Sequence, residues 1–294
     1  MILPLNRRLG GRWDPRWFQI GALSFLLMAG LIRLRFDLGL GRVLVILATV
    51  LGTQYLCGRA WRLPRFDPKS ALISGLSLCL LLRTNSWALA VATGVVAIAG
   101  KFILRWRGKH LFNPTNFGLV AMMLISGKAV WVSPGQWGDF AFFSFLVVCL
   151  GGLVVMRASR ADVTLAFLGG WIGLLCARSA WLGEPLAIPL HRLQNGGLLI
   201  FAFFMISDPK TTPDSRLGRI LFALLVALGA AFVQFKLFRT NGLLWSLAVC
   251  SLGVPFLDRM FPGKRYDWNR PQKVSGAANK TTIAKENVYE PIPV

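Results

Sequence analysis

The stretch ALISGLSLCLLL (Ala71–Leu82), followed by Arg83-Thr84-Asn85, decides the fold that the sequence predicts. It carries no charge and is mostly apolar, but its 12 residues are fewer than the roughly 20 that a helix needs to cross a bilayer. A second such stretch, GGLLIFAFFMI (Gly196–Ile206), is followed by Ser207-Asp208-Pro209. We expect two helices that stop inside the apolar layer, where irregular backbone is tolerated only if protein or a wet cavity covers it.

The rest of the chain alternates between apolar runs and short polar breaks. Of the 294 residues, 55% are hydrophobic and 15% are charged, whereas a soluble domain averages about 25% charged residues, so the composition argues against a soluble enzyme. Ten apolar runs can be recognised: Trp17–Ile32, Leu38–Cys57, Ser70–Leu82, Ser86–Leu104, Phe112–Ser126, Phe140–Met156, Val163–Leu182, Gly196–Ile206, Leu217–Phe235 and Gly242–Leu257. We therefore expect an all-α polytopic membrane protein with about ten transmembrane helices.

Basic residues fall mainly on one side of these runs. The chain has 33 Lys and Arg against 12 Asp and Glu, a net charge of +21. If the N-terminal segment is cytoplasmic, 24 of the 33 basic residues fall on inner segments and 9 on outer ones, as the positive-inside rule requires. This predicts a multi-pass protein of the bacterial cytoplasmic (inner) membrane with both termini in the cytoplasm. No basic stripe with interleaved aromatic residues is present, so we expect the lipid bilayer and not nucleic acid as a partner.

The two short stretches are the third and the eighth of the ten runs, so they occupy equivalent places in two halves of five helices. Because five is an odd number, the halves would have opposite orientations. Paired short segments at matching positions indicate a site near the membrane midplane between inverted repeats. The predicted domains are a cytoplasmic segment 1–16, a membrane domain 17–258 with halves of about 17–126 and 140–258, and a flexible polar tail 259–294.

A polar motif opens the fifth run and has a partial counterpart at the tenth. The two segments are FNPTNFG (Phe112–Gly118) and FRTNG (Phe238–Gly242), which share Phe, Thr-Asn and Gly at the same five-helix offset. Asn113 is suited to cap a helix whose first residue is Pro114, since that position needs no partner for its N–H. The free N–H groups of such a helix end favour an anion or a polar group.

A second polar motif, SDPKTTPD (Ser207–Asp214), lies between the eighth and ninth runs. Asp208 and Thr211 are suited to cap the adjoining backbone in a tight turn. Both motifs are explained equally well as helix caps and turns without any ligand, because every helix end needs partners for its backbone. A binding site and a purely structural role are therefore both open from these residues.

Other polar residues carry weaker expectations. The five cysteines lie apart in apolar runs and the two histidines are far apart, so we expect no metal site. Asp162 is expected to be the N-cap of the seventh helix. Asp258, at a membrane boundary, is expected to pair with Arg259 or with a neighbouring helix. Three basic residues near helix ends are expected to reach the interface by snorkelling: Arg42, Lys101 and Lys236.

Two segments carry a family resemblance. KHLFNPTNFGLV (Lys109–Val120) and FFMISDPKTTPDSRLGR (Phe203–Arg219) resemble the B subunit of the sodium-pumping NADH:quinone oxidoreductase (Nqr B) and the D subunit of the Rnf electron-transport complex (Rnf D). RASRADVTLAFLGG (Arg157–Gly170) looks like a divergent start of that family's seventh helix. The resemblance covers roughly residues 59–258. It implies two inverted five-helix halves, similar in fold to urea transporters, and a flavin-associated subunit of a membrane redox complex coupled to Na⁺ or H⁺ movement.

The chain departs from this family at one point. The family attaches FMN to a threonine of an S/T-G-A-T motif in the outer loop after the fifth helix. Here that loop, Gly127–Gly138, contains no threonine, and the motif occurs nowhere in the chain. The resemblance therefore implies flavin (FMN or riboflavin) held non-covalently and no covalent FMN at the usual place. A short branch with this look accompanies enediyne biosynthesis clusters and has no well-defined activity.

The main functional expectation is an electron-transport membrane protein of the Rnf D/Nqr B type, in which the cofactor does the redox chemistry and the protein holds it. A transporter or channel for a small polar solute or biosynthetic intermediate is the alternative, and a scaffold subunit that needs partner subunits is a third possibility. No catalytic residue is assigned, and whether the chain is itself an enzyme stays open. The candidate cofactor-binding residues are Asn113, Pro114, Thr115, Asn116, Gly118, Ser207, Asp208, Lys210, Thr211 and Thr212.

Overall fold

Helices make up most of the computed structural model, which describes residues 14–33, 36, 38–132, 148, 150–156, 158–193 and 195–266. The helices before residue 130 are α1 (Pro15–Ile32), α2 (Leu40–Ala60), α3 (Lys69–Leu81), α4 (Trp87–Ile103), α5 (Pro114–Ser126) and the short η1 (Gly127–Ala129). Those after residue 160 are α7 (Ala161–Leu182), α8 (Ala187–Leu193), α9 (Gly196–Ile200), η2 (Phe201–Met205), α10 (Arg216–Ala231), η3 (Phe232–Lys236), α11 (Gly242–Ser251) and α12 (Val254–Met260).

Strands are limited, within the described ranges, to two small antiparallel pairs. β1 (Leu82–Arg83) pairs with β4 (Trp131–Val132), with Leu82 opposite Val132. β2 (Arg105–Trp106) and β3 (Lys109–His110) form a hairpin between α4 and α5. The first pair joins the end of α3 to the segment that follows α5, so it fixes where α3 stops.

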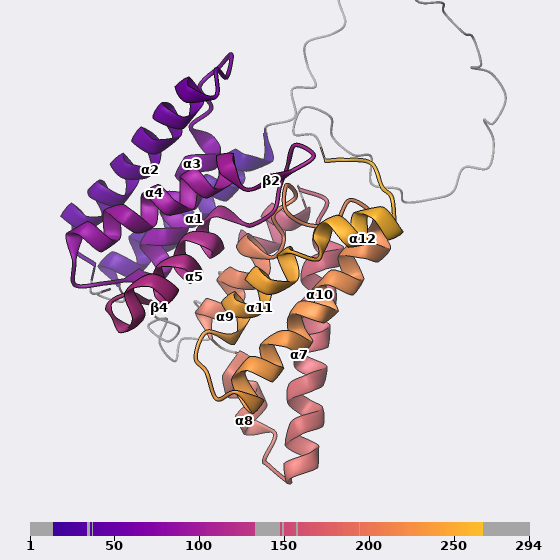
Figure 1. Ribbon diagram of the computed structural model, residues 1–294. Helices are drawn as coiled ribbons and strands as arrows, with labels where there is room; N and C mark the ends of the chain where they lie inside the picture. Colours follow the sequence, from indigo (N-terminus) through magenta and orange to yellow (C-terminus); the bar gives the residue numbers. More distant parts are fainter. Residues whose placement is uncertain are drawn as a thin grey trace, which may run out of the picture.

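The helices form two groups that meet along α5 and α11. In the first group α2 packs against α4 and α4 packs against α5; in the second, α7 packs against α10 and α10 packs against α11. The order of packing is thus the same in both groups. Figure 1 shows α1–α5, in indigo to magenta, beside α7–α12, in pink to yellow, and α5 contacts α11 where the groups meet.

Close helix approach in the first group depends on small residues. A Cβ added to Gly118 of α5 would lie 2.6 Å from Cβ of Ala97 in α4 and 3.0 Å from the carbonyl oxygen of Thr93. Both distances are too short for a side chain at position 118, so the glycine allows α5 to pack against α4. Gly118 was predicted to bind a cofactor, and here it has this packing role. The helix pair in turn fixes the position of the N-terminus of α5.

The third and eighth apolar runs form short helices, as the sequence predicts. α3 has 13 residues, and α9 continues into the π-helical turn η2, which ends at Met205. The second half of α3 and all of η2 are buried, so other parts of the protein cover both segments. A helix that is apolar all round is stable only when protein or lipid covers it.

Several helices are suited to cross a membrane. Within the described residues, α1, α2, α7 and the continuous helix Arg216–Lys236 are long and apolar enough, and α11 with α12, which meet at 52°, would form one bent span more. The segments Lys69–Leu81, Trp87–Ile103 and Gly196–Met205 are shorter apolar helices. The sixth predicted run, 140–156, lies largely outside the described residues, so the count of ten and the inverted repeat stay predictions.

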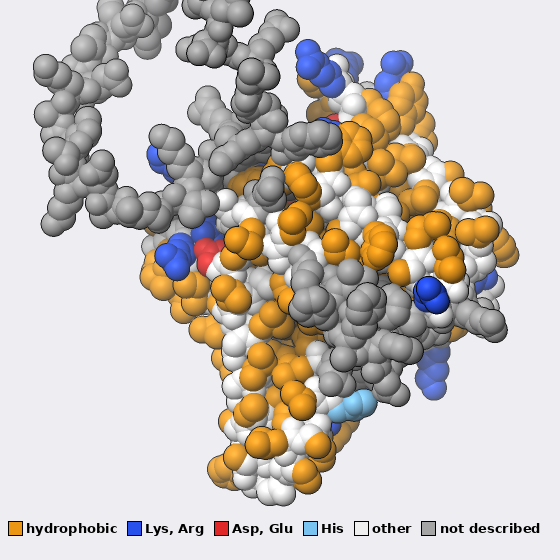
Figure 2. All heavy atoms as spheres, turned by 180° about the vertical axis from the view of Figure 1, so that it is seen from behind, with side chains coloured by type: hydrophobic (Ala, Val, Ile, Leu, Met, Phe, Trp, Pro, Cys, Tyr) orange, Lys and Arg blue, Asp and Glu red, His pale blue; other side chains and the backbone are white. Residues whose placement is uncertain are grey.

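The described surface is largely apolar, as Figure 2 shows for one face of the molecule. Trp181, Ile125 and Leu124 are 88%, 75% and 69% exposed, and many other large hydrophobic side chains are exposed with them. Such a surface would be unusual for a soluble monomer, and it is the surface that a bilayer covers. The chain is a multi-pass membrane protein.

Part of the segment predicted to be a flexible tail packs against the membrane domain. α12 extends to Met260, and Tyr266 is only 6% exposed. The Tyr266 ring lies 4.8 Å from the guanidinium of Arg160, because burial of an aromatic face on a cation is favourable. The predicted tail beyond Tyr266 and nearly all of the predicted segment 1–16 lie outside the described residues.

Candidate functional site

The two polar motifs of the sequence meet in the structure. Asn113 lies just before α5, and its Oδ1 accepts a hydrogen bond from the backbone N–H of Asn116 at 3.1 Å, which confirms the predicted cap. Its Nδ2 donates to the carbonyl oxygen of Met205 at 3.4 Å and to Oδ2 of Asp208 at 3.3 Å. One side chain therefore joins the start of α5 to the end of η2.

The rest of the first motif reaches into both helix groups. Thr115 Oγ1 donates to the carbonyl oxygen of Ser74 in α3 at 3.4 Å, and Asn116 Nδ2 donates to that of Leu244 in α11 at 3.3 Å. Asn116 is fully buried, and its Oδ1 has no hydrogen-bond partner among the described residues. An orphaned buried acceptor costs free energy unless a ligand or water supplies a donor.

The second motif forms the tight turn that its sequence predicts. Oδ1 of Asp208 accepts from the backbone N–H of Lys210 at 3.0 Å, and its carbonyl oxygen accepts from the hydroxyls of Thr211 and Thr212 at 3.4 and 3.1 Å. Ser207 Oγ donates to the carbonyl oxygen of Phe203 at 2.6 Å. Burial raises the pKa of the Asp208 carboxyl above its usual value, because the charged form loses water.

A cavity of about 240 Å³, here called the polar cavity, lies where the motifs meet. Five of the ten predicted residues line it: Asn113, Pro114, Thr115, Asp208 and Lys210. The other five, Asn116, Gly118, Ser207, Thr211 and Thr212, do not line it and instead support the two segments that do. The polar cavity is also lined by residues that the sequence did not single out as a site, including Ser70, Ser74, Ser77, Phe102 and Phe204.

The polar cavity contains more cations than anions. Arg16, Lys101, Arg105 and Lys210 line it, against Asp67 and Asp208. Arg16 forms an ion pair with Asp67. The cavity also includes His110, whose Nδ1 lies 2.9 Å from the carbonyl oxygen of Lys101. Burial lowers the pKa of His110 to about 4, so this imidazole is neutral at neutral pH and donates its Nδ1–H to that carbonyl.

Lys101 corrects a prediction. The sequence predicts that it snorkels to the interface, but it is only 6% exposed and points into the protein. Its Nζ donates to Oε1 of Gln54 at 2.5 Å and to Oγ of Ser70 at 3.2 Å, because α2 and α3 cover this face of α4. A signal was present in the sequence: Lys101 lies inside an apolar run, where an ionisable residue is by default a functional candidate.

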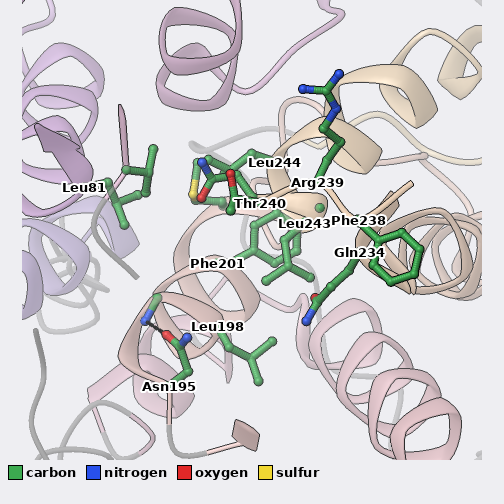
Figure 3. A pocket seen from close by; sticks show the side chains of 15 residues that line it. Leu81, Asn195, Leu198, Phe201, Gln234, Phe238, Arg239, Thr240, Leu243 and Leu244 are labelled. Atoms are coloured by element: carbon green, nitrogen blue, oxygen red, sulfur yellow. Dashed lines mark hydrogen bonds between the residues drawn. The ribbon is translucent and has the colours of Figure 1, made fainter. Parts of the chain in front are cut away.

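A second cavity, the apolar cavity, has a volume of about 420 Å³ and lies at the start of α9 and α11. Figure 3 shows Leu198, Phe201 and Leu243 around it, with Asn195 accepting a hydrogen bond from the backbone of Gly197 at 2.8 Å. None of the ten predicted residues lines it.

The two cavities show how the third and eighth runs lie relative to each other. Leu81, at the end of α3, shares the apolar cavity with Asn195, at the start of α9. Ser70, at the start of α3, shares the polar cavity with Phe204, near the end of η2. α3 and α9–η2 therefore run in opposite directions between the two cavities.

The tenth helix does not repeat the cap of the fifth. Asn241 precedes α11 with a left-handed φ of 61° and makes no side-chain cap; its Nδ2 donates instead to Sδ of Met123 at 3.6 Å. Asparagine tolerates this conformation better than most residues. The shared Thr-Asn pair thus has different local geometry at the two helix starts.

Two acidic residues also differ from expectation. The N-cap of α7 is Arg160, and Asp162 lies in the first turn, where its Oδ2 accepts from Nη2 of Arg219 at 2.5 Å. Asp258 pairs with neither Arg259 nor a neighbouring helix: its Oδ2 is 2.6 Å from Nζ of Lys109 in β3. Lys109 also contacts Asp214 Oδ1 at 2.9 Å.

Among the described residues no cluster of His, Cys, Asp and Glu could hold a metal ion.

A known family matches the second half of the chain. Residues 132–267 match the NQR2, RnfD, RnfE family. The resemblance to Nqr B and Rnf D predicted from the sequence is therefore confirmed. The matched range contains the Asp208 motif of this chain, whereas the Asn113 motif lies before it.

Similarity to individual proteins extends further than the family match. The D subunit of the ion-translocating oxidoreductase complex of Alcanivorax borkumensis is 25% identical over 79% of this chain and 86% of its own length. The protein of the same name from Stutzerimonas stutzeri is 26% identical over 79% of this chain and 84% of its own length. That of Escherichia coli (strain ATCC 8739) is 29% identical over 127 residues, 42% of this chain and 34% of its own length.

Proposed function

We propose that this chain is a membrane electron-transport subunit of the Rnf D/Nqr B type, coupled to ion translocation within a multi-subunit complex. The observation that carries the proposal is the meeting of the Asn113 and Asp208 motifs at the polar cavity, in a chain similar along most of its length to subunits of ion-translocating oxidoreductase complexes. The sequence contains no dinucleotide-binding motif in a credible context, so the electron donor binds to another subunit.

The architecture that goes with this function is two inverted halves of five spans each, with both termini in the cytoplasm of a bacterial inner membrane. Three features support it. The helices of the two groups pack in the same order, α5 and α11 meet between the groups, and α3 and α9–η2 run in opposite directions between the two cavities. Reporter fusions at the two ends of the chain test this topology, and opposite locations of the ends would contradict it.

The polar cavity suits a non-covalently held flavin. A flavin ring presents carbonyl oxygens that need donors and one ring N–H that needs an acceptor. Asn113 and Thr115 line the cavity at the start of α5, and the orphaned Oδ1 of Asn116 belongs to the same motif. The volume of about 240 Å³ is below the roughly 300–1,000 Å³ of common ligand sites. It suits part of a flavin, with the remainder extending beyond the cavity.

The protein's own residues would bind and orient the cofactor, and the flavin when bound would supply the electron transfer. Asn113 holds the start of α5 against Asp208, so the N–H groups at that helix end keep a fixed direction. Met205 lines the apolar cavity while its carbonyl oxygen accepts from Asn113, and so it lies between the two cavities. A shift of this residue would alter both.

The test is to purify the full chain from cells supplied with riboflavin and to measure flavin absorbance before and after acid precipitation. We expect flavin in the protein fraction and its release to the supernatant by acid. Thr115→Val should lower the flavin content several-fold, because it removes a hydroxyl that lines the polar cavity, whereas Asn85→Ala, at an exposed position, should not change it. Absence of flavin from every fraction of the wild-type protein would reject flavin binding.

A transporter for a small polar solute is the second candidate. It is favoured by the presence of a cavity at each end of the antiparallel pair formed by α3 and α9–η2. Uptake of riboflavin into vesicles that contain the purified chain and no electron donor would support transport over electron transfer. Equal riboflavin entry into vesicles with and without the chain would count against it.

A further inference from the structure

A small pocket, here called the basic pocket, lies between the β2–β3 hairpin and α12. Its volume is about 150 Å³. Figure 1 shows the hairpin, labelled at β2, at the same end of the molecule as α12. The basic pocket is distinct from the polar cavity, although His110 lines both. Its lining contains three arginines, one lysine and two acids: Arg107, Arg259, Arg265, Lys109, Asp214 and Asp258.

The charges of the basic pocket do not cancel. Nζ of Lys109 contacts Oδ2 of Asp258 at 2.6 Å and Oδ1 of Asp214 at 2.9 Å, so one lysine engages both acids. The three arginines form no ion pair with any residue that the structure describes. Four cations against two acids leave a net charge of +2. A concave surface with such an excess attracts an anion.

The arginines come from segments that lie far apart in the sequence. Arg107 and Gly108, with φ of 48° and 78°, form the two-residue turn of the hairpin, so Arg107 lies at its tip. Nη2 of Arg265 donates to the carbonyl oxygen of Arg107 at 2.9 Å. A Cβ added to Gly263 would lie 2.6 Å from the carbonyl carbon of Asp214, so this glycine lets the segment after α12 pass close to the start of α10.

This convergence goes beyond what membrane topology requires. The positive-inside rule explains why basic residues lie near one surface of a membrane, but it does not require three of them to line the same pocket. The hairpin turn and the contact of Arg265 with the backbone of residue 107 bring them together. The structure therefore contains a preformed site for an anion at this end of the molecule.

The basic pocket lies beside a surface that suits lipid chains. Pro255 and Arg259 of α12 line the pocket, and the next position around the helix from each, Phe256 and Met260, is 64% and 54% exposed. Trp106 of the hairpin also lines the pocket and is 54% exposed. Tryptophan is enriched where a membrane meets water. The pocket thus lies at the polar end of the bent α11–α12 span.

The size of the pocket and the chemistry of arginine narrow the choice of anion. A volume of about 150 Å³ is below the roughly 300–1,000 Å³ of common ligand sites, so the pocket accepts a small group that belongs to a larger molecule. Guanidinium groups bind phosphate through paired hydrogen bonds. In phosphatidylcholine a cation lies next to the phosphate, and the arginines would repel it. A phospholipid with net negative charge lacks this repulsion.

We propose that the basic pocket binds the phosphate group of an anionic phospholipid, whose acyl chains lie along the exposed apolar side of α12. The lipid would contact the β2–β3 hairpin, which follows α4, and α12 of the second helix group, so it would help to hold the two groups together. Lipid binding at this site is independent of flavin binding and of electron transfer, so either can fail while the other holds.

The experiment titrates the full-length protein in a non-ionic detergent with dioleoyl phosphatidylglycerol or with dioleoyl phosphatidylcholine. The unfolding temperature is measured at each step, because a ligand that binds only the folded state raises it, and the titration gives an apparent dissociation constant. We expect phosphatidylglycerol to bind at least about tenfold more tightly, since a hydrogen bond to a charged group contributes about that factor or more. Glycerol 3-phosphate and polyglutamate, at the same concentrations, should give no shift.

The variants isolate the charge of the basic pocket. Arg107→Gln/Arg259→Gln keeps the contact of Arg265, which uses the backbone of residue 107. The preference for phosphatidylglycerol should fall to about twofold or less, and the unfolding temperature in phosphatidylcholine should not change. The matched control, Arg62→Gln/Arg65→Gln, removes the same charge from exposed positions outside the pocket and should keep the preference.

A single variant covers the case in which Arg107→Gln/Arg259→Gln does not fold. The side chain of Arg107 is exposed and makes no hydrogen bond or ion pair within the described residues, so Arg107→Gln should fold like the wild type. It should weaken the binding of phosphatidylglycerol several-fold and leave that of phosphatidylcholine unchanged. Unchanged binding of both lipids by Arg107→Gln would contradict the site.

Four results would overturn the proposal. Equal affinity of the wild type for the two lipids would show that the pocket does not select an anionic lipid. Equal loss of preference in the two double variants would show general attraction to surface charge. Stabilisation by glycerol 3-phosphate as large as that by phosphatidylglycerol would assign the pocket to a soluble phosphate compound. Stabilisation by polyglutamate that Arg107→Gln/Arg259→Gln abolishes would assign it to an acidic protein surface.

Discussion

The side-chain amide of Asn113 donates to Oδ2 of Asp208 at 3.3 Å, and this contact joins two segments that are 95 residues apart in the sequence. Asn113 also caps α5, so one side chain fixes a helix start and the end of η2 together. The arrangement requires an amide: the acceptor Oδ1 serves the helix, and the donor Nδ2 serves the carboxylate.

Asn113→Asp is expected to destabilise the protein by about 1–3 kcal/mol at neutral pH. The new carboxylate still caps α5 but faces Asp208 with like charge and no donor. Because burial already raises the pKa of Asp208, part of the loss should be recovered at mildly acidic pH, where one of the two acids binds a proton. Denaturant unfolding in detergent measures this. Asn85→Asp, at an exposed position, is the control, and equal losses in both variants would contradict the prediction.

Gly118→Ala tests the close packing of α4 and α5. The added methyl group would lie 2.6 Å from Cβ of Ala97, so the two helices must separate, at a cost of about 1–3 kcal/mol. Gly52→Ala in α2 meets nothing within 4 Å and should be neutral or stabilising, since alanine favours helix. Thermal unfolding of both variants under one set of conditions gives the comparison. A stable Gly118→Ala protein would show that the two helices do not approach as closely as described.

Lys109→Met tests the ion cluster that links the β2–β3 hairpin to the second helix group. Removal of the ammonium leaves the carboxylates of Asp214 and Asp258 without their cation, and these side chains are only 12% and 19% exposed. We therefore expect the free energy of unfolding to fall by about 3 kcal/mol. The matched control is Glu184→Gln, which breaks the more exposed pair with Arg178 and should cost less than about 1 kcal/mol. Equal changes in unfolding temperature for the two variants would mean that the cluster does not hold the groups together.

His110 should make stability depend on pH. Its pKa is about 4 in the folded protein against 6.5 without burial, so the folded state favours the neutral imidazole. The stabilisation of the folded state by the neutral imidazole is complete above pH 6.5 and is lost as the pH falls from 6.5 toward 4. The total loss of unfolding free energy is at most about 3 kcal/mol.

The measurement for His110 is the unfolding free energy of wild type and His110→Asn from neutral pH down to about pH 5, still above the usual pKa of Asp and Glu. The variant keeps a donor for the carbonyl of Lys101 and loses the titrating group, so its stability should change less over this range. His191→Asn, at the exposed second histidine, should follow the wild type. Parallel curves for wild type and His110→Asn would refute the assignment.

Local features of the site are predictable from the sequence, and long-range ones are not. The cap by Asn113 and the turn at Asp208 involve backbone groups two to four residues away, so the residue pattern determines them. The meeting of these two motifs was expected only through the equivalence of the two short runs. Asn241 belongs to the second Thr-Asn pair but makes no side-chain cap, so the pair does not fix the backbone conformation by itself.

Lys101 was mispredicted because the environment of its side chain depends on neighbouring helices. Lys101 lies one turn from the end of its helix, which is the usual setting for snorkelling. Gln54 of α2 and Ser70 of α3 lie over it instead, and no pattern within α4 shows that they do. The partner of Asp258 likewise comes from a hairpin 149 residues earlier in the chain, which no local rule connects to α12.

Lys210 connects the segment after α12 to the polar cavity. Its Nζ donates to the carbonyl oxygen of Tyr266 at 3.1 Å, while the Tyr266 ring lies on Arg160. If another protein bound the segment after α12 and displaced Tyr266, Lys210 would lose a hydrogen-bond acceptor. The same displacement would expose Arg160. The electrostatic potential inside the cavity would then respond to a docking event that touches none of the residues lining it.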